Sequence, residues 1–98
     1  MTISKTLDGD KLTVAIEGRL DTLSAPELEK EVGGCLSGVK QLVFDFEKLE
    51  YISSAGLRVL LTIERMMDAD GTMKVTNVNE LVQELFEVTG FSDVITIE

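Results

Sequence analysis

The first elements of the chain are marked by apolar residues at alternating positions. Residues 11–17 carry an apolar side chain at every second position, which is typical of a strand with one buried face. Residues 2–7 precede it, and the intervening Asp8-Gly9-Asp10 has the composition of a tight turn. The pattern predicts an antiparallel hairpin at the N-terminus.

Three later stretches repeat apolar residues at the helical spacing. The first begins near Ser24, where Ser24-Ala25-Pro26-Glu27 has the form of a capping box. The second runs from about Ser54 to Met67, and the third opens at Asn77-Val78-Asn79-Glu80 and ends at Gly90. The buried positions predicted for these helices are Leu28, Val32, Cys35 and Leu36, then Leu57, Leu60, Leu61 and Met67, and finally Val78, Leu81, Val82, Leu85 and Phe86.

The remaining strands follow from short apolar runs. Leu42-Val43-Phe44, within residues 41–46, predicts a central strand that is covered on both faces. Residues 72–75 and 94–97 are interpreted as two further short strands. The order β-β-α-β-α-β-α-β predicts one small α/β domain over residues 1–98, with a mixed, mostly parallel sheet, an N-terminal hairpin and three main helices.

Two loops of this arrangement are expected to meet. In sheets of this type, sites lie outside the carboxyl ends of the strands. Gly18-Arg19-Leu20-Asp21 follows the second strand, and the segment with Ser53 and Ser54 follows the central strand. We expect both at the same edge of the sheet, with Asp21 able to serve as a turn or cap residue there.

Composition excludes several classes of function. The chain has 98 residues and a net charge of −9, which argues against binding nucleic acid or an anionic membrane surface. It has no histidine, so Ser-His-Asp catalysis and histidine-containing zinc sites are absent. One cysteine, Cys35, is expected in the core of a reduced protein. No stretch resembles a signal peptide or approaches the roughly 20 residues of a membrane span, which favours a cytoplasmic location.

The serine pair at the start of the second helix is the main candidate for chemistry. Backbone N–H groups at a helix N-terminus are unpaired and favour negative charge. Ser53 or Ser54 can therefore cap the helix, act as a nucleophile or accept a phosphate. Ala55 and Gly56 carry little side chain, which predicts that another protein can approach closely, and Arg58 is either a solvated residue or a partial neutraliser of a phosphate.

Three motifs together resemble a known family. They are Gly18-Arg19-Leu20-Asp21, the apolar strand Leu42-Val43-Phe44-Asp45-Phe46, and the loop Tyr51-Ile52-Ser53-Ser54-Ala55-Gly56-Leu57. Over essentially all 98 residues the chain resembles STAS domains, specifically the small bacterial anti-sigma factor antagonists, or anti-anti-sigma factors.

The resemblance implies a switch between partners. The serine two residues before the motif glycine, here Ser54, is the phosphoacceptor of the family. The unphosphorylated domain binds a serine kinase that doubles as an anti-sigma factor, and so frees a sigma factor. Phosphorylation dissociates the complex, and a metal-dependent serine phosphatase resets it. The domain itself needs no cofactor or metal, catalyses nothing and is commonly a monomer when free.

The resemblance also implies which residues meet the kinase. The aspartate matching Asp21 helps contact the kinase in relatives. We expect the rest of the partner-binding surface to comprise Ser53, Ala55, Gly56, Leu57 and Arg58.

The chain departs from the family at three positions. Many members have aspartate at the position of Ser53, so a second hydroxyl makes Ser53 an alternative acceptor. Many have serine or threonine at the position of Ala55, so one competing hydroxyl is lost here. Arg58 replaces a glycine of some relatives, which predicts an altered choice of partner.

Other functions compete with this one. A STAS subunit of a membrane transporter or other regulatory assembly has the same sequence pattern without phosphorylation. A small enzyme with Ser54 as nucleophile is a further alternative, although no histidine is present to serve as its base. A carrier protein with a serine-linked prosthetic group is the weakest, because such acidic domains are all-helical.

Overall fold

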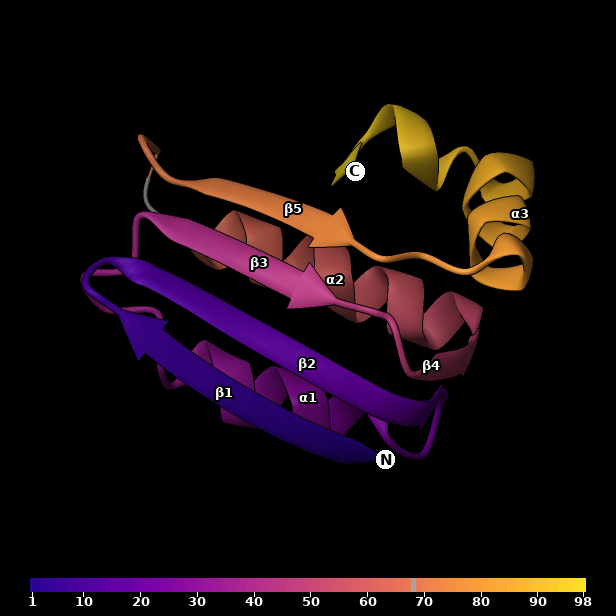
Figure 1. Cartoon of the computed structure of the whole chain (residues 1–98), viewed down its shortest axis with the longest axis horizontal. Helices are drawn as coiled ribbons and strands as arrows, with labels where there is room; N and C mark the ends of the chain where they lie inside the picture. The colour runs from indigo at the N-terminus through magenta and orange to yellow at the C-terminus, as the bar shows by residue number, and fades with distance from the viewer. Residues whose placement is uncertain (68) are drawn as a thin grey trace.

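The computed structural model describes residues 1–67 and 69–98. Within that part of the chain, six strands and three helices confirm the predicted small α/β domain (Figure 1). In chain order they are β1 (Thr2–Asp8), β2 (Lys11–Leu20), α1 (Ala25–Gly33), β3 (Gln41–Asp45), β4 (Leu49–Ile52), α2 (Ser54–Met66), β5 (Thr72–Thr76), α3 (Glu80–Thr89) and β6 (Thr96–Ile97).

The sheet has the strand order β1-β2-β3-β5-β6, with β4 paired to β2. β1 and β2 form the predicted antiparallel hairpin, and the other pairs are parallel. β2 is shared, because its first half pairs with β3 and its last residues, 18–20, pair with β4. The register shifts at Gly18, whose φ of 100° lies in the region that favours glycine. The end of β2 therefore lies beside β4.

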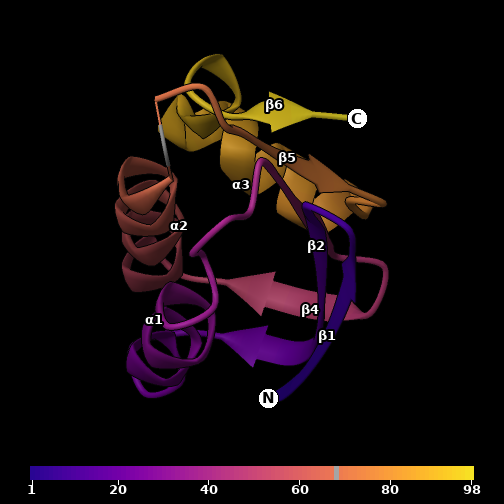
Figure 2. The same ribbon diagram turned by 90° about the vertical axis from the view of Figure 1, so that its left-hand side faces the viewer.

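Helices cover one face of the sheet. α1 and α2 lie next to each other behind β1, β2 and β3 in Figure 1. Figure 2 shows both on one side of the sheet, and the opposite face carries no helix of the described residues. Burying each large apolar side chain between these layers contributes about 1.5–3 kcal/mol. The fully buried residues include Val14 of β2, Leu42 and Phe44 of β3, Val75 of β5, Leu28 and Val32 of α1, and Leu60 and Ile63 of α2.

The central strand is buried as predicted, although not by elements on both faces. Val43 points to the face without helices and is only 6% exposed. Thr13 of β2 and Lys74 of β5 stand directly beside it in register. Neighbouring side chains on the same sheet thus replace the second covering layer that the sequence predicted.

α3 closes the end of the sheet toward which the parallel strands run (Figure 1). The Asn79 side chain caps this helix, because it accepts a hydrogen bond from the Val82 N–H at 2.9 Å and donates one to the Leu49 carbonyl at 2.7 Å. The helix ends at Gly90 with φ 76°, as predicted. A row of tilted aromatic rings, Phe44–Phe46–Phe86–Phe91, joins α3 to the core at centroid distances of 5.0–6.3 Å.

The structure adds one strand and shortens another. β4 was not expected, because four residues with a charged side chain at Glu50 give too short a pattern to recognise. The strand predicted over residues 94–97 is reduced to β6, and a 3-10 turn, Phe91–Asp93, precedes it.

Several predicted core residues lie outside the core. Cys35 is exposed, because α1 ends at Gly33 and leaves the thiol beside Glu31 and the Lys5 amine. Leu81 is 51% exposed, because α3 packs at the end of the sheet and buries only its narrow opposite face. Half-buried positions are taken by Leu61, Met67, Val78 and Leu85, at the edge of the core.

None of the helices within residues 1–67 and 69–98 has the length and apolarity required to cross a lipid bilayer.

Candidate functional site

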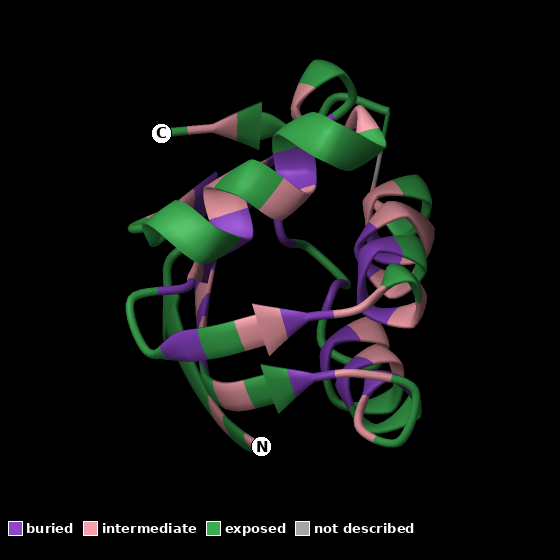
Figure 3. Cartoon of the chain, turned by 90° about the vertical axis from the view of Figure 1, so that its right-hand side faces the viewer, coloured by how far each residue is buried: buried purple, intermediate pink, exposed green. Residues whose placement is uncertain are grey.

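The two loops expected to meet do so at the carboxyl end of β2 and β4 (Figure 3). Leu20 pairs with Ile52, and the Ser53 N–H donates a hydrogen bond to the Leu20 carbonyl at 2.9 Å. One loop continues from β2 into α1, and the other passes directly from β4 into α2. The candidate site is therefore a rim formed by two helix starts that share one backbone contact.

The two serines of the site have different surroundings. Ser53 is the N-cap of α2, with extended backbone angles and a half-buried side chain that accepts a hydrogen bond from the Gly56 N–H at 3.4 Å. Ser54 is the first helical residue and is exposed. Within residues 1–67 and 69–98 no group hydrogen-bonds its hydroxyl. The capping role thus falls to Ser53 and leaves the Ser54 oxygen available.

Gly56 has a different purpose from the one predicted. It is buried, and a Cβ atom at this position would lie 2.8 Å from Ile52 Cγ1, 2.8 Å from Leu20 Cγ and 2.9 Å from the Leu20 carbonyl oxygen. The glycine therefore allows the first turn of α2 to approach β2 and β4. The expectation that Gly56 opens the surface to another protein is wrong, because the space in which a side chain would stand is already occupied by Leu20 and Ile52.

The other predicted partner contacts divide between surface and interior. Leu57 is only 8% exposed and packs in the core, so its side chain is not presented to a partner. Ala55 is half-buried and Arg58 is exposed. Arg58 forms no ion pair with any described residue, and it lies one helical turn after Ser54.

Asp21 is used inside the loop that follows β2. Its Oδ1 atom accepts hydrogen bonds from the N–H groups of Leu23 at 3.0 Å and Ser24 at 3.2 Å. These bonds, above all the one from the Ser24 N–H, hold the pKa of the Asp21 carboxyl below its ordinary value. The Ser24 hydroxyl in turn accepts from the Asp21 N–H and donates to the Arg19 carbonyl, both at 2.9 Å.

The capping box predicted at Ser24 is therefore absent. Ser24 has helical backbone angles, and its side chain makes no cap hydrogen bond to α1. The Asp21 carboxylate instead accepts from the N–H groups of Leu23 and Ser24 and so folds a turn ahead of the helix. The first N–H groups of α1 are accepted by the Asp21 and Ser24 carbonyls.

Arg19 and Tyr51 form a contact that the sequence did not indicate. The Arg19 guanidinium lies 4.4 Å from the centroid of the Tyr51 ring, and Arg19 Nε lies 3.9 Å from Asp21 Oδ2. The register of β2 against β4 places the two residues opposite each other. Only a recognised β4 could have revealed this pair.

The electrostatics of the α2 start favour an added negative charge. The first turn of α2 contains no acidic residue, whereas α1 has Glu27 and α3 has Glu80 in theirs. The unpaired N–H groups of a helix start carry a partial positive charge. A phosphate on Ser54 would therefore meet a partly positive helix start, with the Arg58 cation one turn away.

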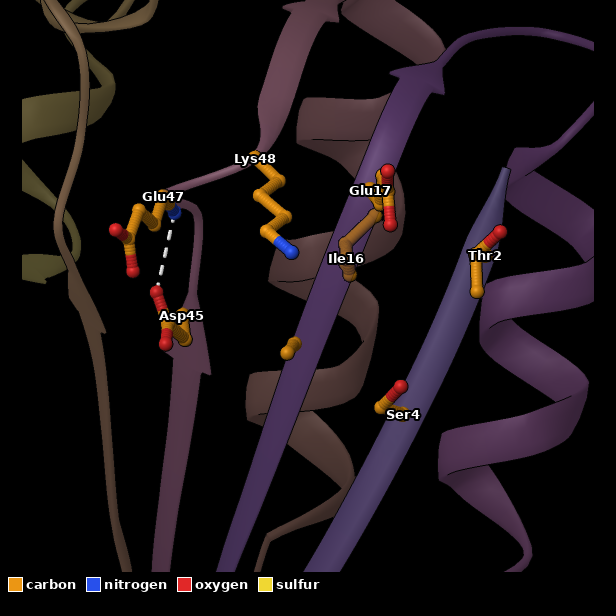
Figure 4. Close-up of a pocket in the computed structure, with 8 residues that line it drawn as sticks. Thr2, Ser4, Ile16, Glu17, Asp45, Glu47 and Lys48 are labelled. Carbon is orange, nitrogen blue, oxygen red and sulfur yellow. Dashed lines mark hydrogen bonds between the residues drawn. The ribbon is translucent and has the colours of Figure 1, made fainter.

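A hollow of about 250 Å³ lies elsewhere, on the sheet face without helices (Figure 4). Asp45 and Glu47 lie at one side of it, where the Glu47 N–H donates to the Asp45 carboxylate at 3.0 Å. Lys48 extends over the space between β3 and β2. The residues around it are Thr2, Ser4, Ala15, Ile16, Glu17, Asp45, Glu47 and Lys48, and none of them belongs to the serine loop.

Comparison with known proteins gives consistent matches. The model of the STAS domain family matches residues 2–98. BtrV of Bordetella bronchiseptica, whose name assigns it provisionally as an anti-sigma factor antagonist, is 31% identical over 93 residues, which cover 93% of this chain and 79% of BtrV.

Solved structures share the fold. The crystal structure of an anti-sigma factor antagonist from Mycobacterium paratuberculosis matches with a TM-score of 0.89 at 21% identity, covering 98% of this chain and 83% of that one. The Bacillus protein SpoIIAA matches with a TM-score of 0.76 in its unphosphorylated form and 0.75 in its phosphorylated form, at 15% and 16% identity. These matches cover 99% of this chain and 87% and 91% of the SpoIIAA chains.

Proposed function

This chain belongs to the STAS domain family, and from that premise we propose that it is an anti-sigma factor antagonist that works by switching partners. Its unphosphorylated form binds an anti-sigma factor that is also a serine kinase, which releases a sigma factor in the cytoplasm. The kinase phosphorylates Ser54 and the complex dissociates. A serine phosphatase removes the phosphate, and the domain performs no catalysis of its own.

The observation that carries this proposal is the difference between the two serines. Ser54 is exposed at the first position of α2, and no described residue holds its hydroxyl. A kinase can therefore bring ATP to this oxygen without disturbing the fold. Modification of Ser53 would have to break the cap hydrogen bond to Gly56 and pull a half-buried side chain outward.

Electrostatics provide the switch. A phosphate adds about −1.5 to −2 charge at pH 7 to a chain whose net charge is −9. At the centre of a contact surface this charge introduces repulsion and a desolvation cost for the partner. The start of α2 accommodates the same charge without refolding. SpoIIAA offers a parallel, since the fold of this chain matches its phosphorylated and unphosphorylated forms almost equally well.

Phosphorylation by the cognate kinase tests the proposal directly. The serine kinase encoded nearest to this protein in its genome is incubated with the chain and ATP, and the product is mapped by mass spectrometry. We expect one phosphate on Ser54, absent from Ser54→Ala and retained in the matched variant Ser53→Ala. We also expect Ser54→Asp to lose binding to the kinase. Modification mainly on Ser53, or none by a kinase shown to be active, would overturn the site.

The same experiment separates the competing functions. A STAS subunit of a transporter would remain unmodified, and an enzyme would turn over a reporter ester in a manner that depends on Ser54. Size-exclusion chromatography with light scattering checks the expectation that the free chain is a monomer.

A further inference from the structure

Leu23 is the most exposed large apolar residue in the described part of the chain. Its side chain is 91% exposed, against 79% for Val88 and 64% for Leu7. Single apolar residues on a surface are ordinary and need no explanation in themselves. Two properties distinguish Leu23: the fixed backbone that carries it and its position beside the serine loop.

The backbone around Leu23 is held by hydrogen bonds from both sides. The Leu23 N–H donates to the Asp21 carboxylate, and the Ser24 hydroxyl bonds to both the Asp21 N–H and the Arg19 carbonyl. Two polar side chains are thus used to fix a turn whose tip displays an apolar one. A side chain on a fixed turn loses little backbone freedom when it binds, which favours a contact of higher affinity.

The position of Leu23 places it within reach of any protein that covers Ser54. The Leu20 carbonyl accepts the Ser53 N–H, and Leu23 follows Leu20 by three residues, a span of at most about 11 Å. The backbones of Leu23 and Ser54 are therefore at most about 20 Å apart, since one more residue and one strand spacing complete the path. A typical interface covers about 800 Å² on each partner, a disc roughly 30 Å across.

The surroundings of Leu23 indicate the chemistry of the partner surface. Leu23 borders a surface hollow of about 460 Å³, to which Glu27 and Glu50 also contribute. Arg19 also borders the hollow, but its guanidinium lies over the Tyr51 ring and its charge faces Asp21. Beside the carboxylates of Glu27 and Glu50, the apolar side chain of Leu23 fits an apolar pocket whose border is basic. The Asp21 carboxylate also borders the hollow, but its Oδ1 atom is used by the turn and its Oδ2 atom faces Arg19 Nε.

We propose that Leu23 is a direct contact of this chain with its kinase partner, inserted into an apolar pocket with a basic border, and that Asp21 is a positioning residue that holds the turn displaying Leu23. This inference rests on the proposed function. It changes the role of Asp21 from a charge that meets the partner to a carboxylate that shapes the loop.

Binding measurements with matched variants test the two roles. Affinity for the same serine kinase is measured by isothermal titration for wild type, Leu23→Ala, Asp21→Asn and Asp21→Ala. Leu7→Ala is the control, because Leu7 is an exposed leucine in β1 beside the hairpin turn, at the other end of the sheet (Figure 1). We expect Leu23→Ala to weaken binding about tenfold or more and Leu7→Ala to leave it within about twofold.

The Asp21 pair separates charge from position. Asp21→Asn removes the charge but keeps an oxygen that accepts the two N–H groups, so we expect binding close to that of wild type. Asp21→Ala removes the acceptor, so we expect a loss similar to that of Leu23→Ala. Hydrogen exchange should show the Leu23 and Ser24 amides protected in wild type and Asp21→Asn, and unprotected in Asp21→Ala.

Each opposite result has a distinct meaning. If Leu23→Ala binds like wild type, Leu23 is not a contact and the inference is overturned. It is also overturned if Asp21→Asn loses as much affinity as Asp21→Ala while its amides stay protected, because Asp21 then acts by its charge. If wild type itself neither binds the kinase nor is phosphorylated by it, the proposed function fails, and the amide protection alone still reports on the turn.

Discussion

Two helices start side by side at the same rim. We call a start complete when the N–H groups of its first turn all have acceptors, and only the start of α1 is complete. At the start of α1, the Asp21 and Ser24 carbonyls accept the N–H groups of Ala25 and Glu27, Pro26 between them has none, and Glu27 adds a negative charge in the first turn. At the start of α2, one long hydrogen bond of 3.4 Å to Ser53 serves as the cap, and the first turn has no acidic residue.

The difference shows how a helix start can keep a preference for an anion without strain. A helix start that lacks a charge is stable enough to fold, because packing of its buried face carries most of the free energy. It also retains a preference for an anion that a complete start no longer has. The rim thus combines a fixed loop, suited to display Leu23, with an incomplete helix start, suited to receive a phosphate.

The largest expected effect concerns the packing beneath the incomplete start. Gly56→Ala places a Cβ within 2.9 Å of Leu20 and Ile52, so we expect the free energy of unfolding to fall by about 1–3 kcal/mol. Gly34→Ala is the control, because its Cβ would find only ordinary contact with the Lys30 carbonyl at 3.6 Å. Urea unfolding monitored by circular dichroism measures both variants. Equal stability would mean that α2 does not need its close approach to β2.

The next effect compares the two serines that begin the helices. Ser24→Ala removes an acceptor for the Asp21 N–H and a donor to Arg19, so we expect a loss of about 1–2 kcal/mol in the free energy of unfolding. Ser53→Ala removes one long cap bond, so we expect a loss of only about 0.5 kcal/mol. Denaturant unfolding of the two single variants provides the comparison. A reversed order would contradict the distinction between a complete and an incomplete start.

A smaller effect, a gain in stability, is expected when a negative charge is added to the first turn of α2, which has no acidic residue. Ser54→Asp should raise the free energy of unfolding by about 0.3–1 kcal/mol at low ionic strength, because the carboxylate meets the start of α2. Ser54→Asn has a similar shape without the charge and serves as the control. Thermal unfolding at low and high salt measures the difference, which should shrink as salt screens it. A destabilised Ser54→Asp would show that the helix start is not electropositive.

The smallest expected effect is a pH dependence of local stability, confined to the turn that Asp21 holds after β2. The pKa of Asp21 is lowered in the folded state, so its contribution to stability is present above the ordinary value of 3.8 and is lost as pH falls through the lowered pKa. The Leu23 and Ser24 amides should therefore lose protection from hydrogen exchange in acid, whereas the Gly56 amide, held by a hydroxyl, should not respond at the same pH. Simultaneous loss at both helix starts would indicate global unfolding instead.

Periodicity in the sequence predicted the elements that have long patterns. The hairpin, the helices and the buried β3 all follow from apolar spacing, and Gly90 marks the end of α3 correctly. β4 was not predicted, because it is only four residues long. The contact of Arg19 with Tyr51, which depends on β4, was therefore not predicted either. A pairing between distant strands is set by tertiary contacts that local patterns do not contain.

The site could be predicted in outline but not in detail. The sequence placed Asp21, Ser53 and Ser54 at one rim, yet it did not distinguish a cap from a free hydroxyl. That distinction depends on which serine has extended backbone angles, and here it is Ser53. Gly56 was interpreted as leaving the surface accessible to a partner. The sequence does not show that Leu20 lies where a side chain at position 56 would stand.

In the proposed function, the buried glycine has a consequence for recognition of Ser54 by the kinase. Gly56 sets the height of the first turn of α2 above the strands, and Ser54 is carried on that turn. A larger residue at position 56 would lift the serine oxygen by a distance on the order of 1 Å, enough to slow a transfer reaction by about a hundredfold. Gly56 thus acts as a spacer of minimal thickness, and it sets how far the serine stands out from the molecule when an active site is fitted over it.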